Sequence, residues 1–78
     1  MKIELRLYAS LSVYAPEIGR NAVMVDAGEG TTINDLLNRF KVPVDVVKMI
    51  FLNGVHAEGD EVLKDGDRVG VFPPVAGG

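Results

Sequence analysis

The chain contains 78 residues, 47% of them hydrophobic, and carries a formal net charge of −3. This length allows a single domain with one small core, and the hydrophobic fraction is too high for a disordered chain. The absence of cysteine excludes disulfides, thiolate nucleophiles and iron–sulfur clusters, and the lack of a Lys or Arg cluster argues against a nucleic-acid partner.

The first predicted element is a strand near the N-terminus. Ile3, Leu5 and Leu7 alternate with residues of more polar character, and this period of two indicates a strand with one buried face. Residues 9–15 break the alternation and predict a short helical turn that ends at Pro16.

A second strand is predicted at residues 21–26, after a loop at residues 17–20. Residues 27–30 contain two glycines and predict a turn. We expect the two strands to form an antiparallel pair, although the segment that connects them is longer than a tight hairpin.

The strongest helix signal in the chain begins at Thr32. Its hydroxyl is a good N-cap, and Asp35 stands three residues later, in the position of the reciprocal capping partner. Pro43 disfavours helical geometry at Val42, so we expect the helix to end near Lys41. Apolar residues at helical spacing form one stripe, which indicates core packing rather than a ligand site: Ile33, Leu36, Leu37 and Phe40.

The second half of the chain predicts short strands joined by turns. Residues 44–48 form an irregular connector or a short turn, and Asn53-Gly54 is a favoured pair for a tight hairpin. Residues 65–67 read Asp-Gly-Asp, a second turn signal. Strands are expected on either side of these turns, at residues 49–52, 55–57 and 68–72.

One helix that crosses one small mixed sheet is the simplest way to bury the apolar stripe, which predicts a two-layer α+β domain. We assign residues 1–72 to this domain and residues 73–78 to an extended tail. Pro73 and Pro74 fix φ and lack a backbone N–H, so they should end the last strand and hold the tail away from the body.

Gly77 and Gly78 make the thinnest peptide that a chain can form, because glycine has no Cβ. Such a tail can enter a narrow channel and bring the α-carboxylate of Gly78 to a nucleotide phosphate. At ~3.3 Å per residue, the six residues of the tail could reach about 20 Å. The alternative is an ordinary frayed terminus.

The remaining polar residues give no catalytic or metal signal. His56 is the only histidine, has no second ligand at metal spacing, and is expected to be a surface residue. Five acidic residues in the C-terminal half form either a solvated loop face or a docking surface for a basic partner: Glu58, Asp60, Glu61, Asp65 and Asp67. No signal peptide and no apolar run near the ~20 residues of a membrane span is present, so a soluble, cytoplasmic protein without a membrane partner is expected.

The whole pattern resembles the β-grasp fold of ubiquitin-like proteins. Within that fold it resembles the sulfur-carrier family of MoaD- and ThiS-like proteins, especially the small subunit of molybdopterin synthase. The resemblance lies in the first strand, the helix start, the Asn-Gly hairpin, the Asp-Gly-Asp turn and the Pro-Pro…Gly-Gly ending, at residues 3–9, 30–37, 51–54, 63–69 and 72–78. It implies a mixed sheet of four to five strands packed on one main helix, with a flexible C-terminal tail.

The resemblance also implies a function at the carboxylate of Gly78. An E1-like adenylating enzyme would join this carboxylate to AMP from ATP, and a persulfide donor would convert it to a thiocarboxylate. The large synthase subunit, or another acceptor enzyme, would then take the sulfur. The chain itself would bind no cofactor or metal and would catalyse nothing. The tail residues expected to enter the partner channel are Pro73, Pro74, Val75, Ala76 and Gly77.

Four residues are candidates for partner docking, because they lie opposite the predicted core positions of the first and last strands: Arg6, Tyr8, Gly70 and Phe72. The resemblance leaves other roles open. The sulfur could serve thiamin thiazole, cysteine or tRNA thiolation. Gly78 could instead be joined to lysines of other proteins, as in a ubiquitin-like modifier, or the tail could be inert.

Overall fold

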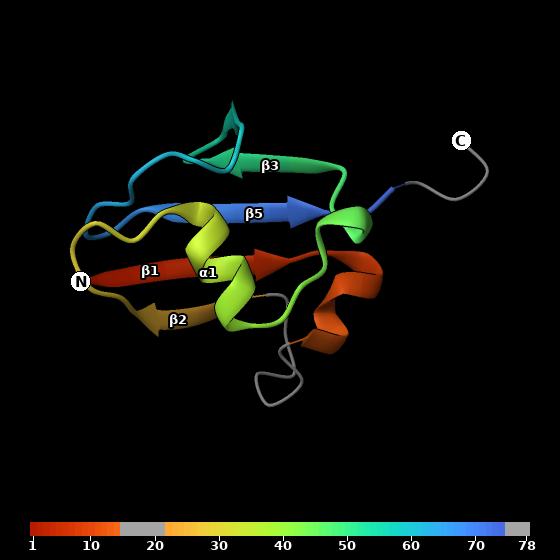
Figure 1. Ribbon diagram of the computed structural model, residues 1–78, viewed down its shortest axis with the longest axis horizontal. Helices are drawn as coiled ribbons and strands as arrows, with labels where there is room; N and C mark the ends of the chain where they lie inside the picture. The colour runs from red at the N-terminus through yellow and green to blue at the C-terminus, as the bar shows by residue number, and fades with distance from the viewer. Residues whose placement is uncertain (15–21, 75–78) are drawn as a thin grey trace.

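The computed structural model describes residues 1–14 and 22–74 and contains one mixed sheet with one α-helix across it (Figure 1). The strands are β1 (Lys2–Leu7), β2 (Ala22–Asp26), β3 (Met49–Leu52), β4 (Val55–Ala57) and β5 (Arg68–Phe72). The helix is α1 (Ile33–Arg39), and two 3-10 turns are η1 (Ala9–Tyr14) and η3 (Val44–Val46).

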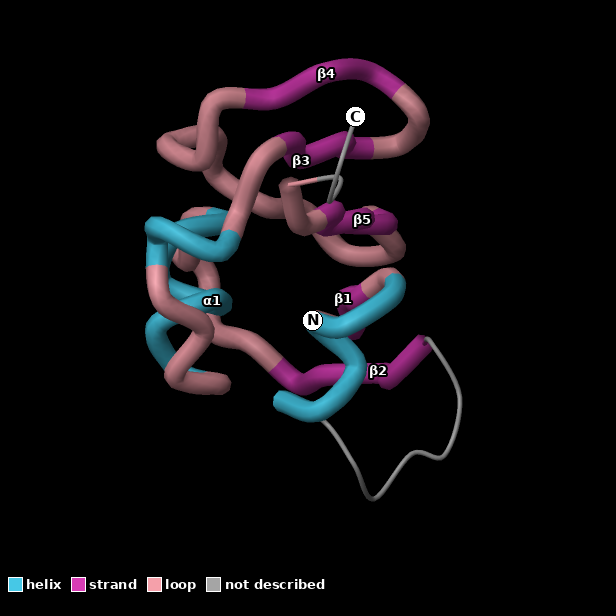
Figure 2. Tube along the Cα trace, turned by 90° about the vertical axis from the view of Figure 1, so that its right-hand side faces the viewer, coloured by secondary structure: helices cyan, strands magenta, loops and turns pink. Residues whose placement is uncertain are grey.

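The five strands lie in the order β2-β1-β5-β3-β4. β1 and β5 pair in parallel, and the other three pairs are antiparallel. The first and last strands of the chain are therefore neighbours in the middle of the sheet. This arrangement confirms the predicted α+β class with two layers, and Figure 2 shows α1 on one side of the sheet.

The core lies between the sheet and α1. Alternate residues of β1 and β5 are almost inaccessible to solvent, and the helix contributes three members of its predicted apolar stripe. Phe40, the fourth, is half-buried and packs at the edge of this core. Each fully buried Leu or Ile side chain stabilises the fold by roughly 1.5–3 kcal/mol. The largest fully buried side chains are Ile3, Leu5, Leu7, Leu11, Ile33, Leu36, Val69 and Val71.

The capping box predicted at the helix N-terminus is confirmed. The Asp35 N–H donates to the Thr32 hydroxyl over 3.1 Å, and the Thr32 N–H donates to the Asp35 carboxylate over 3.0 Å. Two further N–H groups of the first turn donate to the loop after β4: Ile33 to the Glu61 carbonyl and Asn34 to the Gly59 carbonyl. The backbone donors that a helix start leaves free are thus satisfied by a segment distant in sequence.

Glu61 also organises the loop that caps α1. Its carboxylate accepts the backbone N–H groups of Glu58 and Gly59 at 2.8 and 2.7 Å. These bonds favour the charged form and lower the pKa of the Glu61 carboxyl below its ordinary value.

The helix ends two residues before the predicted end at Lys41, and for a different reason. Lys41 adopts a left-handed φ of 58°. Its N–H donates to the Asn38 carbonyl, and the Val42 N–H donates to the Leu37 carbonyl. This pair of bonds is the Schellman motif, which satisfies the last carbonyls of a helix and brings the buried Leu37 and Val42 together. The backbone at Lys41, rather than Pro43, ends α1.

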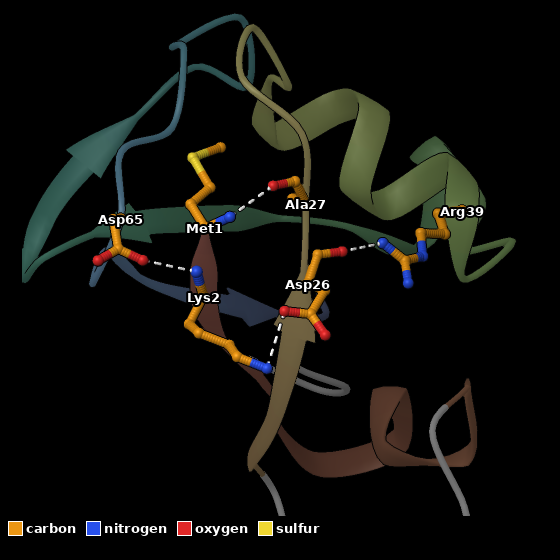
Figure 3. Close-up of polar contacts among 6 residues, drawn as sticks. All are labelled: Met1, Lys2, Asp26, Ala27, Arg39 and Asp65. Atoms are coloured by element: carbon orange, nitrogen blue, oxygen red, sulfur yellow. Dashed lines mark hydrogen bonds and ion pairs between the residues drawn. The ribbon is translucent and has the colours of Figure 1, made fainter.

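Polar contacts tie four segments together at the end of the sheet where β1 begins (Figure 3). The Met1 amine donates to the Ala27 carbonyl over 3.0 Å, and the Lys2 N–H donates to the Asp65 carboxylate over 2.7 Å. Lys2 also forms an exposed ion pair with Asp26, which lowers the pKa of that carboxyl. The Arg39 guanidinium donates to the Asp26 carbonyl and joins α1 to the same corner.

The short turns predicted from the sequence are also present in the structure. The helical turn expected at residues 9–15 is confirmed as η1, and the short turn expected within residues 44–48 is confirmed as η3. The Asn53-Gly54 hairpin is confirmed, with positive φ at both residues. The predicted end of the first turn at Pro16, the loop at 17–20 and the first residue of the predicted second strand, Asn21, lie outside the described residues.

Replacement of Lys41 by glycine is expected to stabilise the protein. A left-handed conformation strains a residue with a Cβ, whereas glycine adopts it freely. After the entropy that glycine adds to the unfolded chain is subtracted, the gain should be about 0.5–1 kcal/mol. Urea unfolding would measure it. Lys64→Gly is the matched control, because Lys64 is also exposed but lies outside the left-handed region. Equal effects of the two substitutions would contradict this account of the helix end.

Candidate functional site

The tail leaves the body from the middle of the sheet. β5 ends at Phe72, at the end of the sheet opposite the Met1 corner, and Pro73 and Pro74 follow it (Figure 1). Val75, Ala76, Gly77 and Gly78 lie outside the described residues. The position of the last described residues therefore fixes where the predicted tail begins.

Phe72, which precedes Pro73, is held by three residues from other parts of the chain. Its ring stacks on the ring of Tyr8, with centroids 4.2 Å apart and planes 4° from parallel. The Phe51 ring meets it edge-on at 5.7 Å. Its backbone carbonyl accepts the Lys48 N–H over 2.8 Å. We call Tyr8, Phe51 and Phe72 the tail-root cluster.

Gly70 makes room for this cluster. A Cβ at this position would lie 3.3 Å from Cε2 of Tyr8, closer than most carbon contacts in proteins. Gly70 is the partner of Arg6 in the parallel β1–β5 register and of Phe51 in the antiparallel β3–β5 register. The structure therefore brings together all four residues predicted as docking candidates, three on the neighbouring strands β1 and β5 and one just past the end of β1: Arg6, Gly70, Phe72 and Tyr8. Their docking role stays a prediction.

A hollow lies on the sheet face opposite α1, and Gly70 is one of its lining residues. No described helix covers this face. We call this hollow the Gly70 hollow. It is lined by Glu4, Arg6, Tyr8, Phe51, Gly54, Arg68, Gly70 and Phe72.

Arg6 is held in place at the edge of the Gly70 hollow. Its Nε donates to the Glu4 carboxylate over 2.6 Å, two residues earlier on the same face of β1. This bond raises the pKa of the Arg6 guanidinium, which favours its charged form. The pair leaves little net charge on this part of β1.

A second, largely apolar hollow lies next to the start of the tail. It shares Phe51 and Phe72 with the tail-root cluster, and Met49, which is 39% exposed, opens onto it. Its lining consists of Ala9, Ser10, Lys48, Met49, Phe51, Phe72, Pro73 and Pro74. Apolar surface exposed this close to the tail root is typical of a site that a partner covers.

The sequence prediction missed several residues of this face. Phe51 stands within a short apolar run whose residues do not alternate in polarity, so the sequence does not separate the two faces of this strand; its side chain lines the outer hollow. Arg68 could have been identified from the sequence, since alternation along the last strand places it on the same face as Gly70 and Phe72. Alternation along the first strand could have identified Glu4 in the same way.

Other candidate chemistry receives no support from the geometry. His56 is exposed and touches Phe51 edge-on, with centroids 5.9 Å apart, in line with the predicted surface role. Over residues 1–14 and 22–74, no three acidic or histidine side chains lie close enough together to hold a metal ion. No helix in the same residues is both long and apolar enough to cross a membrane.

Comparisons with known proteins agree with this architecture. Residues 12–78 match the ThiS family. The small archaeal modifier protein 3 of Haloferax volcanii is 30% identical over 95 aligned positions, which cover 100% of both chains.

Two solved structures are similar over nearly their whole length. One is the putative molybdopterin converting factor, subunit 1, of Pyrococcus furiosus, with a TM-score of 0.74, 30% identity, and coverage of 96% of this chain and 99% of that one. The other is a complex of subunits 1 and 2 of the molybdopterin-converting factor of Helicobacter pylori, with a TM-score of 0.64, 26% identity and coverage of 100% of both chains. These matches and the five-stranded mixed sheet confirm the predicted β-grasp class.

Loss of the Tyr8 ring is expected to loosen the tail root. Tyr8→Ala removes the stack on Phe72 and should lower the free energy of unfolding by about 1–3 kcal/mol. Tyr8→Phe keeps the ring and should change it by less than about 0.5 kcal/mol. Urea unfolding of the two variants gives the comparison. If Tyr8→Ala proves as stable as Tyr8→Phe, the stack does not anchor Phe72.

Proposed function

The chain belongs to the ThiS family of ubiquitin-like sulfur-carrier and modifier proteins, and on this premise we propose that it carries sulfur for molybdopterin synthesis. The proposal rests above all on the start of the tail, where three residues hold Phe72 directly before a Pro-Pro…Gly-Gly segment. A body that anchors the start of a slender tail is suited to presenting the end of that tail to other proteins.

We choose molybdopterin synthesis as the pathway because of the similarity to two solved structures. The Pyrococcus furiosus protein is described as a subunit of a molybdopterin converting factor, and the Helicobacter pylori protein as one of two subunits in a complex. By analogy, this chain would pair with a large subunit that binds the pterin precursor. The catalytic groups would lie on that subunit, and this chain would supply the sulfur.

The chemistry would take place at the α-carboxylate of Gly78. A carboxylate oxygen attacks the α-phosphorus of ATP on an E1-like enzyme, pyrophosphate leaves, and an acyl adenylate forms. The terminal sulfur of a donor persulfide then attacks the acyl carbon and expels AMP, which leaves an acyl disulfide. A thiol cleaves the sulfur–sulfur bond and releases the thiocarboxylate. ATP is consumed by the partner, so this chain needs no bound cofactor, and loading would occur in the cytoplasm.

Each tail residue type has a physical role in this proposal. Gly77 and Gly78 would pass through a narrow channel in the partner because they carry no side chain. Pro73 and Pro74 would reduce the entropy lost when the tail, including Val75 and Ala76, becomes ordered in that channel. The absence of cysteine means that the activated acyl group meets no thiol on its own chain.

A second candidate function is a protein modifier. The specific observation in its favour is the 30% identity to a small archaeal modifier protein. In this case a lysine amine of a target, rather than a persulfide, would attack the activated Gly78. Carriers for thiamin thiazole, cysteine or tRNA thiolation share the loading step and differ only in the acceptor.

Loading of Gly78 is the first test. The protein is incubated with ATP, a persulfide donor and the E1-like enzyme of the same genome, and its intact mass is measured. We expect the mass gain that corresponds to replacement of one oxygen by sulfur. Deletion of Gly78 should abolish this gain, while the amide spectrum of residues 1–72 stays unchanged because the described core is built from residues between Ile3 and Val71.

Two results would contradict the carrier proposal. Transfer of the chain to lysines without any thiocarboxylate would favour the modifier. Full activity of the Gly78 deletion in cells would mean that the tail is inert.

Replacement of Pro73 and Pro74 by glycine is expected to weaken use of the tail by the E1-like enzyme. The added tail entropy, about 0.4–1 kcal/mol for each residue, should raise KM for loading by roughly twofold to fivefold per residue and leave kcat nearly unchanged. Pro43→Ala, an exposed proline before η3, is the control and should not alter KM. A change in kcat alone would indicate that the prolines act within the chemical step.

A further inference from the structure

We propose that the Gly70 hollow binds a partner segment that places a carboxylate next to an apolar side chain, with Arg68 as the residue that pairs with the carboxylate. This inference rests on the proposed function, because it assigns the chemistry of the surface by which a partner would hold the body. It concerns the folded body of the protein. The tail, by contrast, would be used in the same way by every partner.

The walls of the hollow select an apolar side chain. Tyr8, Phe51 and Phe72 all line it, and their mutual contacts hold the rings in place. Gly70 also lines it and contributes no side chain. The volume of the hollow, about 420 Å³, is larger than a single apolar side chain needs, which leaves room for a neighbouring polar group.

Arg68 also lines the hollow, and its positive charge has no ion-pair partner within the described structure. Glu4 is the register partner of Arg68, but its carboxylate bonds to Arg6 instead. Within residues 1–14 and 22–74, the Arg68 guanidinium has neither a hydrogen bond nor an ion pair. Arg68 is exposed, and its planar guanidinium can bind a carboxylate through two parallel bonds.

Glu4, the acidic residue that lines the hollow, is paired with Arg6, and several other acidic residues are used within the fold. Glu61, Asp65 and Asp67 accept backbone N–H groups in the loops between β4 and β5. Lys48, near the tail root, adds a second positive charge beside the neighbouring apolar hollow. A chain with net charge −3 therefore presents a locally positive sheet face, which complements an acidic segment and repels a basic one.

A nucleic acid is a poorer match for this surface. Binding of a phosphate backbone needs several Lys or Arg residues along a stripe, because each neutralised phosphate releases counterions. The Gly70 hollow offers one unpaired guanidinium among three aromatic rings. This composition suits a single carboxylate beside an apolar group, as found in a protein segment.

The test measures affinity for the E1-like enzyme and for the large subunit of the same genome, at low and at high salt. Arg68→Glu should weaken binding about tenfold at low salt, and the difference should shrink at high salt because the contact is at the exposed rim. Lys41→Glu is the matched control. It makes the same change in net charge on an exposed residue after α1, away from the Gly70 hollow, and should stay within about twofold of the unmodified protein. Amide spectra of both variants verify that they fold.

Several outcomes would overturn the inference. Equal affinities of the two variants would do so, as would tighter binding by Arg68→Glu. A shift of the Gly70 amide signal with protein concentration in the isolated protein would also do so, because it would place a second copy of the chain in the hollow. Thiocarboxylate formation on the unmodified protein is scored separately. Normal loading together with equal affinities rejects the Arg68 contact alone, whereas no loading with weakened Arg68→Glu binding rejects the carrier function alone.

Discussion

The parallel pairing of β1 with β5 is the contact on which the rest of the structure depends. It places the first and last strands of the chain side by side in the middle of the sheet. On the inner face, the pairing stacks Leu5 and Leu7 beside Val69 and Val71 in the core. On the outer face, it brings Tyr8, just past the end of β1, against Phe72 at the end of β5. The same register therefore stabilises the domain and builds the surface from which the tail departs.

The sequence predicted most of the architecture because its local signals agree with the tertiary packing. Alternation in residues 2–7, the capping pair Thr32 and Asp35, and the Asn53-Gly54 turn each have one favoured local structure, and the packing preserves it. The end of α1 was predicted less well. A lysine in the left-handed region is uncommon, and it is tolerated here because Leu37 and Val42 pack together across the turn. The contact between Leu37 and Val42 cannot be predicted from local conformational preference alone.

The candidate site was predicted in part. Period two placed Arg6, Tyr8, Gly70 and Phe72 on one face, but only strand order could show that β1 and β5 are adjacent. Phe51 was missed because β3 pairs with β5 through a register that no local pattern contains. The sequence also could not show which surface charges are paired, because side-chain geometry decides whether the Glu4 carboxylate bonds to Arg6 or to Arg68.

The corner at Met1 and the tail root lie at opposite ends of the same two parallel strands. A pulling force applied between these two points runs along the strands rather than across them. It therefore loads the bonds between β1 and β5 together, in shear, instead of opening them one after another as in a zipper. Such a force must break this set of bonds together, so the pairing of β1 with β5 resists extension of the domain between these two points.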